Sequence, residues 1–406
     1  MTRSNRLSSL RAAAFCLWLL MLASGCTPLR MQLSSSAMIK IQPAAYPIFE
    51  DSMSLDGLHH GIVQSLSYLK RVPESKKFIF GKEVFDTSQM IHSLEAFLTF
   101  LCKRPTLQAI QAYINENCWV YQSVGAGKPG RVLFTGYYEP LLEGRRKKDA
   151  TYRYPLYARP EDHVTINLSL FSPQYKGIAL IGRISDHEVV PYHDRQEIDE
   201  KGVLEGKAKV LAWLKDPVDL FFLQIQGSGK VYLDTGQLMN VHYHTTNGHP
   251  YRSIGKLLIE EGKIPAERMS MQAIRTYLHD HPTEVGRILN HNPSYVFFKT
   301  EKQGPIGYMG VRLTPGRSLA LDRRLFPPAA LVFIKTKQPL IDGSGKIHRW
   351  VDFTGFALNQ DTGGAIRGPG RADLFWGNGP YAEIAAGHMQ HEGQLYFLVL
   401  KPKQKR

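Results

Sequence analysis

The spacing of apolar residues divides this 406-residue chain into helical and strand-like segments. Between residues 58 and 118, apolar side chains recur every three or four positions, which predicts helices. Asp86 and Thr106 stand where the caps of such helices belong. The two apolar helical faces consist of Ile62, Leu66 and Leu69, and of Met90, Leu94, Leu98 and Leu101.

After residue 131 the pattern changes to short apolar runs, which are typical of strands. These runs are 132–134, 178–181 and 220–222. Helical spacing returns over 253–261, 269–278 and 284–289, and strands separated by glycine turns follow from Tyr295. The order predicts an α+β chain, mainly β, in which one segment is inserted into a larger domain.

The N-terminus has the composition of an export signal. Arg3, Arg6 and Arg11 precede an apolar run at 12–23, and Ser24-Gly25-Cys26 follows it. The run is shorter than the roughly 20 apolar residues that a membrane-spanning helix needs. We therefore expect a lipoprotein signal peptide at 1–25, lipidation of Cys26 and a linker at 26–45. An ordinary signal peptide cut near the same cysteine is the alternative.

The export signal limits which binding partners could account for the positive net charge of the chain. Fifty basic and 36 acidic residues give a net charge of +14, of which the signal peptide holds three arginines and no acid, leaving +11. An exported protein rarely meets nucleic acid, so we expect an acidic surface such as peptidoglycan stem peptides or anionic lipid headgroups. Cys102 and Cys118 could pair in an oxidising compartment or remain as two buried thiols.

The stretch 360–377 carries the most specific chemistry. Asp361 and Asp373 stand twelve residues apart with four glycines between them, and Phe375-Trp376 follows the second acid. In a strand, Asp373 and Phe375 would share one face. An acid in such an apolar setting can stay protonated near neutral pH and act as a general acid, and a nearby Asp361 would strengthen this effect. The simpler alternative is a turn or strand-end aspartate bonded to the backbone.

Two other signals compete with this interpretation. Asp361-Thr362-Gly363 and Asp234-Thr235-Gly236 both match the aspartic protease triad, but only 45 residues follow Asp361, too few for a protease lobe of roughly 100 residues. Asp234 is better explained as a hairpin turn. His242, His244 and His249 lack a nearby carboxylate or cysteine partner, so we expect no metal and no cofactor.

Several motifs resemble the membrane-bound lytic murein transglycosylase A family, and they follow the family's order over most of the chain after about residue 45. The acids Asp322, Asp361 and Asp373 match its three-aspartate domain. One departure is 327–330, Pro-Pro-Ala-Ala, where the family usually has a glycine and a threonine after the prolines. Other matching runs are Phe-Thr-Gly-Tyr-Tyr-Glu-Pro at 134–140, Leu-Gln-Ile-Gln-Gly-Ser-Gly at 223–229, Asn-Gly-His-Pro-Tyr-Arg-Ser-Ile-Gly at 247–255, Ser-Met-Gln-Ala-Ile-Arg at 270–275, Asn-Pro-Ser-Tyr-Val-Phe-Phe at 292–298 and Leu-Thr-Pro-Gly-Arg-Ser at 313–318.

The resemblance implies a fold of two parts. Residues 46–139 and 300–406 would form a larger domain of helices and a double-psi β-barrel, with the three-aspartate region at 310–380. A second β-barrel with helices would occupy 140–299. A groove between these parts would hold an extended polymer.

The resemblance also implies a reaction and its residues. The β-1,4 bond between N-acetylmuramic acid and N-acetylglucosamine would be cut with formation of 1,6-anhydromuramic acid ends, and Asp373 would act as the single general acid and base. Asp361 and Asp322 would support it, and the enzyme would face the periplasm from the outer membrane, because Thr27 rather than aspartate follows Cys26. The expected glycan-binding residues are Thr135, Tyr137, Tyr138, Gln226, Gly227, Ser228 and Trp376.

Three other activities remain open at the level of the sequence. A lipoprotein that binds peptidoglycan without cutting it would give no soluble fragments. A muramidase-type hydrolase would release reducing muramic acid ends. An aspartic protease would need Asp234 and Asp361 together.

Replacing Cys26 by serine tests the anchor. We expect Cys26→Ser to abolish lipidation and recovery in the membrane fraction, because acyl chains on this cysteine would tether the chain without a spanning helix. Membrane fractionation with an activity assay measures this. Equal membrane retention of the serine variant would exclude lipid anchoring at Cys26.

Overall fold

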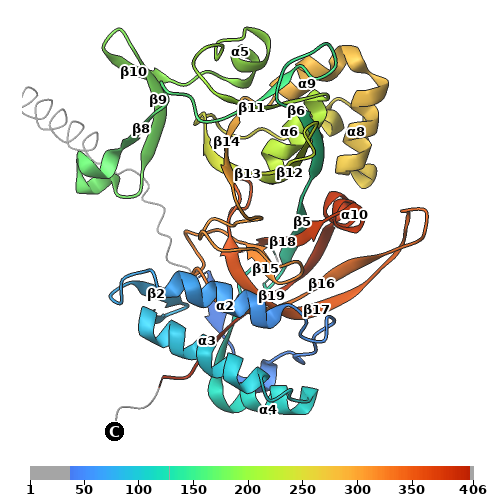
Figure 1. Cartoon of the computed structure of the whole chain (residues 1–406). Coiled ribbons are helices and arrows are strands. Elements are labelled where there is room, and N and C mark those ends of the chain that lie inside the picture. Colours follow the sequence, from blue (N-terminus) through green and yellow to red (C-terminus); the bar gives the residue numbers. More distant parts are fainter. Residues whose placement is uncertain (1–36, 128, 403–406) are drawn as a thin grey trace, which may run out of the picture. The chain divides into compact units, whose positions relative to one another are not determined.

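The computed structural model describes residues 37–127 and 129–402, which contain two curled β-sheets with helices packed against them (Figure 1). The proposed signal peptide and Cys26 lie outside the described residues. The chain is α+β and mainly β, as expected. None of the helices in the described part is both long and apolar enough to cross a membrane.

The larger sheet contains a closed barrel. Its order is β1-β4-β19-β16-β17-β15-β18-β5, and a further pairing of β19 with β5 closes the last six strands into a ring. The strands are β1 (Met38–Lys40), β4 (Cys118–Ser123), β5 (Val132–Glu139), β15 (Ser318–Ala320), β16 (Leu331–Ile341), β17 (Ile347–Asp361), β18 (Arg371–Asn378) and β19 (Gln390–Leu400). Two chain segments far apart in sequence, β5 and the C-terminal strands, therefore build one barrel.

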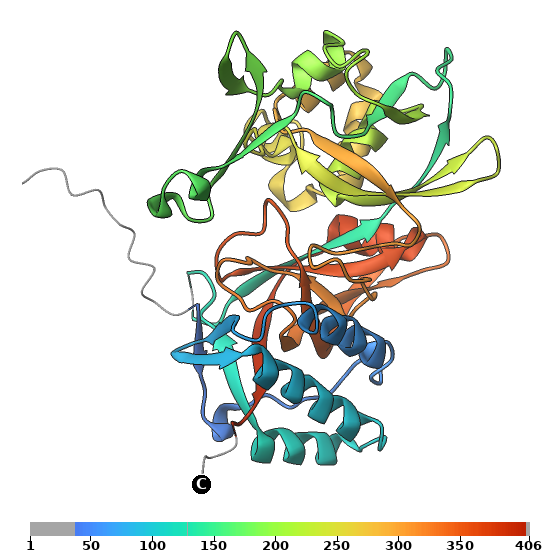
Figure 2. The same ribbon diagram turned by 60° about the vertical axis from the view of Figure 1, so that its left-hand side comes forward.

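Helices from the N-terminal segment cover this barrel. In Figures 1 and 2, α2 (Leu58–Leu69), α3 (Thr87–Leu101) and α4 (Leu107–Asn117) appear in blue to cyan beside it, and α2 packs on β17 while α3 packs on β19. The side chains of Asp86 and Thr106 accept hydrogen bonds from the first turns of α3 and α4, which confirms both predicted caps. The apolar helical faces predicted from the sequence pack in the main core, where Leu98 and Leu101 are partly buried and the other residues of the two faces are buried.

The second sheet is built from strands between residues 141 and 301. Its order is β14-β13-β12-β6-β11-β7, and a bridge between Ala158 and Phe298 joins its two edges. Its strands are β6 (Leu141–Arg145), β7 (Tyr154–Tyr157), β11 (Val210–Leu214), β12 (Ser228–Leu233), β13 (Leu238–Thr246) and β14 (Val296–Glu301). A separate three-stranded sheet consists of β8 (Val164–Asn167), β9 (Ala179–Ser185) and β10 (Glu188–Pro191).

The helices of this segment begin at the polar residues that its sequence supplies. Asp194, Asp216, Ser253 and Ser270 each accept a backbone hydrogen bond as the N-cap of a helix. The helices are α5 (Arg195–Glu200), α6 (Pro217–Gln226), α7 (Ile254–Glu260), α8 (Met271–Asp280) and α9 (Val285–Asn290). The last three match the predicted helical stretches.

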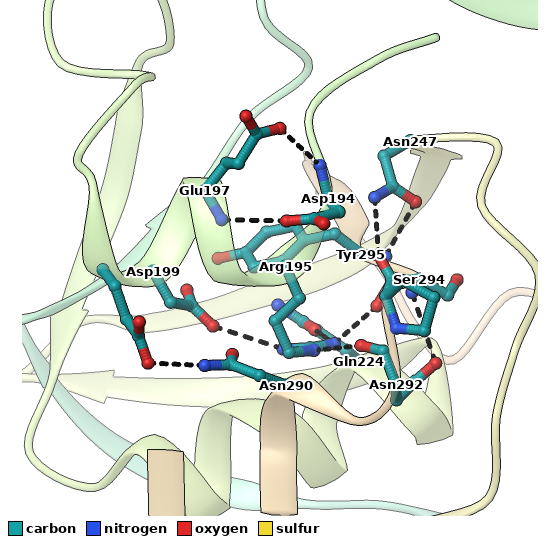
Figure 3. Close-up of polar contacts among 12 residues, drawn as sticks. Asp194, Arg195, Glu197, Asp199, Gln224, Asn247, Asn290, Asn292, Ser294 and Tyr295 are labelled. Carbon is teal, nitrogen blue, oxygen red and sulfur yellow. Dashed lines mark hydrogen bonds and ion pairs between the residues drawn. The ribbon is translucent and has the colours of Figure 1, made fainter. Parts of the chain in front are cut away.

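A buried arginine holds this segment together (Figure 3). The Arg195 side chain is 1% exposed, and it donates hydrogen bonds to the carbonyl oxygens of Asn292 and Ser294 and to the amide oxygen of Gln224. The amide of Asn247 bonds the backbone of Tyr295 on one side and of Pro293 on the other. The motifs at 247–255 and 292–298 therefore have a structural role. Through these hydrogen bonds, α5 and α6 are connected to residues 292–295, near the end of the segment.

Several expectations from the sequence are wrong. Residues 220–222 are not a strand but part of α6, because Asp216 caps a helix and Pro217 fits its first turn. Part of the expected linker, 38–40, forms β1 on the edge of β4. The sequence pattern also missed α10 (Pro380–His388) and the hairpin of β2 (Lys77–Phe80) and β3 (Glu83–Asp86).

The two cysteines do not pair, and only one is buried. Cys102 is exposed at the end of α3, whereas Cys118 is buried where β4 begins, and both are free thiols. Burial raises the pKa of the Cys118 thiol to about 12. The alternative of two free, buried thiols is therefore correct for Cys118 and wrong for Cys102, which is free but exposed.

The departure from the family pattern at 327–330 has a structural counterpart. Ala329 has a φ of 62°, in the left-handed region that favours glycine. Its amide donates to the carbonyl oxygen of Asn359, whose side-chain amide donates to the carbonyl oxygen of Pro327. These bonds to β17 hold the turn in a conformation that alanine adopts at an energetic cost.

A second buried arginine ties the N-terminal segment to the barrel. The Arg317 side chain is fully buried and forms a two-pronged ion pair with Asp51, whose side chain is 4% exposed. Arg317 also donates to the carbonyl oxygens of Asp56 and Phe356. Burial alone would raise the pKa of Asp51, but the bonds from Arg317 lower it, so the acid stays ionised.

We expect Arg317→Leu to lower the free energy of unfolding by about 3–5 kcal/mol, because it leaves Asp51 buried without a partner. The loss should narrow as pH falls below about 4, the ordinary pKa of an aspartate, because protonation of Asp51 then removes the ion pair from the parent as well. Chemical denaturation at several pH values measures both effects.

Lys337→Leu is the matched control. Lys337 pairs with Asp352, but these side chains are 41% and 84% exposed, so the loss should stay below about 1 kcal/mol. Equal losses in the two variants would contradict the role given to Arg317.

Candidate active site

Three adjacent barrel strands bring two of the predicted acids together. Ala320 on β15 lies opposite Asp361 at the end of β17 and opposite Asp373 on β18. The eleven residues between the acids therefore connect the two strands that flank one short strand. This arrangement explains why Asp361 acts electrostatically on Asp373.

Asp373 has the environment of a general acid. The hydroxyl of Thr135 on β5 donates to Asp373 Oδ1 at 2.7 Å, and the carboxyl group is half-buried. Within the described part of the chain, Asp373 Oδ2 has no hydrogen-bond partner. Burial raises the pKa of Asp373 to about 6, and the negative charge of Asp361 adds to this, while Thr135 and Arg371 oppose it.

Asp361 is held by three donors. The backbone amides of Tyr308 and Thr362 donate to Asp361 Oδ1 at 2.8 and 2.9 Å, and the hydroxyl of Tyr137 donates to Oδ2 at 2.9 Å. Burial raises the pKa of Asp361, and these bonds oppose the rise. The pKa of Tyr137 lies well above its usual value because of burial and both acids, so its hydroxyl remains a donor.

Asp322 is a buried structural anion. Its carboxylate accepts hydrogen bonds from the side chain of Arg324 and from the backbone amide of Gly368. Burial would raise its pKa, but these bonds lower it to about 2. Gly368 lies in the loop between Asp361 and Asp373, so Asp322 fixes that loop.

The expected glycan-binding residues are divided over several positions. Thr135 and Tyr137 point to the face of the acids, whereas Tyr138 is buried on the other face of β5 and bonds Glu383. The backbone amide of Tyr138 donates to the side chain of Gln226, at the end of α6. Gly227 follows with a φ of 76°, and Ser228, 6% exposed, begins β12.

Trp376 lies on the opposite face of β18 from Asp373. It packs in the main core, its indole nitrogen donates to the sulfur of Met389, and Gly136 on β5 leaves room for it. Phe375 is the aromatic residue on the face of the acids, where its ring centroid lies 5.2 Å from that of Tyr137. The structure therefore does not bring Trp376 together with Asp373.

Two site residues were missed from the sequence. Arg371 stands two positions before Asp373 on the same strand face and lowers its pKa, which the period of a strand could have revealed. Tyr308 reaches Asp361 through its backbone amide from a loop after β14, and no sequence pattern marks that contact. In the described residues, no cluster of three or more histidine, cysteine or acidic side chains could hold a metal.

The second protease-like triad lies elsewhere. Asp234 is exposed in the turn between β12 and β13, in the sheet of the 140–299 segment, as expected for a hairpin residue. Asp361 ends a strand of the barrel sheet. The paired carboxylates that a protease needs are therefore not formed by these two residues.

Comparison with known proteins gives consistent matches over this chain. The MltA specific insert domain matches residues 133–299, and the 3D domain matches residues 317–399. The chain is 34% identical to the membrane-bound lytic murein transglycosylase A of Escherichia coli (strain K12) over 285 residues, which are 70% of this chain and 69% of that protein.

Solved structures match nearly the whole chain. A membrane-bound lytic murein transglycosylase from Agrobacterium tumefaciens is 30% identical with a TM-score of 0.72, covering 90% of this chain and 98% of that one. The Escherichia coli MltA crystallised with bound chitohexaose is 27% identical with a TM-score of 0.68, covering 91% of this chain and 96% of that one.

Carboxyl NMR titration tests the electrostatics of the acid pair. We expect Asp373 to titrate near pH 6 in the parent protein. Thr135→Val should raise this pKa by removing a hydrogen bond to the carboxylate, whereas Asp361→Asn should lower it by removing a negative charge. The exposed Asp352→Asn should leave it unchanged. Shifts of the same sign in the Thr135 and Asp361 variants would contradict the assigned causes.

Proposed function

The chain belongs to the membrane-bound lytic murein transglycosylase A family, and from this premise we propose that it cuts the β-1,4 bond between N-acetylmuramic acid and N-acetylglucosamine to leave 1,6-anhydromuramic acid ends. At the coarser level it is a lyase that acts on peptidoglycan. The observation that carries the finer proposal is the state of Asp373, which is half-buried, has a pKa of about 6 and leaves Oδ2 without a partner in the described residues.

Asp373 begins the reaction as the acid. Its proton passes to the glycosidic oxygen as the bond from that oxygen to the anomeric carbon of muramic acid breaks. The N-acetylglucosamine side leaves with a new hydroxyl group, and Asp373 becomes a carboxylate. A pKa near 6 supports this step because a substantial fraction of the carboxyl group is protonated near neutral pH.

The same carboxylate then acts as the base. It accepts the proton of the C6 hydroxyl of muramic acid while O6 bonds to the anomeric carbon, which closes the anhydro ring and restores protonated Asp373. The nucleophile belongs to the sugar itself, so the protein needs only to orient it. An ordinary glycosidase would need a second carboxylate as base or nucleophile.

The neighbouring residues tune and position this acid. Thr135 orients the carboxyl group, and Asp361, fixed by Tyr137, disfavours a second negative charge beside it. Asp322 holds the loop between the acids. Gln226, Gly227 and Ser228 are our candidates for holding the glycan, and Tyr138 anchors Gln226 through its backbone amide. The chitohexaose bound by the Escherichia coli relative supports a glycan strand as the ligand.

A lipid anchor is the proposed route to the membrane. The relatives are named membrane-bound, and Cys26 supplies an acylation site in the sequence. We propose attachment to the outer membrane with the enzyme facing the periplasm. Proteins that make or cut the cell wall are the class of partner that this location would offer.

Product analysis separates this proposal from its alternatives. Purified sacculi treated with the enzyme should release fragments with 1,6-anhydromuramic acid ends, identified by mass spectrometry. Asp373→Asn should reduce turnover by about 10²–10⁴-fold while sacculus binding and the unfolding transition stay unchanged. Fragments with reducing muramic acid ends would instead indicate a hydrolase, and binding without any fragments a non-catalytic protein.

Asp234→Asn is the control, since this exposed turn residue should have no effect on turnover. A folded Asp373→Asn protein that keeps half of the parent activity would refute the catalytic assignment.

The pH dependence gives an independent test. Because the first step needs protonated Asp373, activity should fall as pH rises through about 6. Asp361→Asn should slow the enzyme and move this fall to lower pH, and Thr135→Val should move it to higher pH. A pH–rate profile that is identical in the parent and both variants would contradict the role of Asp373 as the acid.

A further inference from the structure

Arg323, beside the acids, forms no hydrogen bond or ion pair within the described part of the chain. Arg323 directly follows Asp322, and the backbone amide of Leu321 donates to the carbonyl oxygen of Asp361. The Arg323 side chain is exposed, and its guanidinium carbon lies 4.6 Å from the centre of the Tyr308 ring. The backbone amide of Tyr308 donates to Asp361 at 2.8 Å, so both residues belong to the edge of the acid pair.

Three other arginines near this site have partners in the protein. Arg317 binds Asp51, Arg324 binds Asp322, and Arg371 donates to the hydroxyl of Thr135. In the described part of the chain, Arg323 makes no hydrogen bond or ion pair. An arginine that stacks on a ring through its flat face keeps its N–H donors free at the edge.

The surroundings of Arg323 are open and aromatic. Tyr308 is 59% exposed and Tyr243 is 50% exposed, although aromatic side chains are usually buried. Burial raises the pKa of Tyr243, and the charge of Arg323 opposes that rise. The backbone amide of Tyr243 donates to the carbonyl oxygen of Gly227, in the candidate glycan-holding segment.

We propose that Arg323, stacked on Tyr308, binds a carboxylate carried by the muramic acid of the substrate. This inference rests on the proposed function. Every muramic acid carries a lactyl group, which ends either in a free carboxylate or in a stem peptide with carboxylates of its own. The negative charge of Asp361 would repel such an anion, so a substrate of this charge needs a nearby cation with free donors, and a guanidinium fits a carboxylate with two parallel hydrogen bonds.

Binding of glycan strands to the full chain carrying Asp373→Asn tests this inference without cleavage. The probes are peptide-free glycan strands, the same strands with their carboxylates converted to amides, and peptide-bearing strands. Arg323→Gln should weaken binding of the carboxylate-bearing strands about tenfold, as expected for one lost charge-assisted contact, and leave the amidated strands unchanged. Arg323→Lys should retain part of the difference, because it keeps the charge but not the fork.

Arg349→Gln is the matched control. Arg349 is an exposed arginine on β17, and its replacement should leave the binding of every probe unchanged.

With Asp373 present, Arg323→Gln should raise KM about tenfold on the carboxylate-bearing strands and leave kcat nearly unchanged, because the contact exists before and during the reaction. A loss confined to peptide-free strands identifies the lactyl carboxylate, and a loss on peptide-bearing strands identifies the stem peptide.

Two results would overturn the inference and leave the proposed function intact. One is equal binding of all strands by the parent and Arg323→Gln, and the other is an equal loss on native and amidated strands. If the parent bound no glycan strand and released no fragment from sacculi, the proposed function would fail together with this inference.

Discussion

The position of the acids depends on the buried ion pair of Arg317 and Asp51. Arg317 directly precedes β15, the short strand whose Ala320 lies between Asp361 and Asp373. Next to it, the hydroxyl of Ser318 donates to the side chain of Gln360, which in turn donates to the carbonyl oxygen of Gly61 on α2. A buried network of this kind is stabilising only when every member is satisfied. Helix α2 and the strand ends that carry the acids are therefore fixed by the same bonds.

The chemistry of the site follows from this rigid frame. Asp373 and Asp361 have raised pKa values because the barrel buries them on the two strands that flank β15, whereas Asp322 has a pKa lowered to about 2 because Arg324 and Gly368 satisfy its carboxylate. The three aspartates thus have different protonation behaviour. The difference lies in the donors that each one meets and not in the residue type.

Arginine serves two purposes in this chain, and burial separates them. Arg195 and Arg317 are almost fully buried, and each joins segments far apart in sequence through several backbone carbonyl oxygens. Arg323 is exposed, stacked on an exposed tyrosine and, within the described residues, free of an acidic partner. Because desolvating a guanidinium is costly, the N–H donors of a buried arginine must bond to acceptors in the protein. The donors of an exposed arginine can remain available for a ligand.

The sequence by itself determined the local structure and the identity of the acids. Helix periodicity, the caps Asp86 and Thr106, and the motifs around Asp322, Asp361 and Asp373 were all readable, because each depends on residues close together in the chain. The sequence could not separate a strand from a helix at 220–222, nor show that Trp376 packs in the main core. Only the tertiary structure decided these points, and it alone placed Thr135, Tyr137 and Tyr308 around the acids. Their contacts span from 53 to 238 residues, and those of Thr135 and Tyr137 exist because the barrel closes β5 against the C-terminal strands.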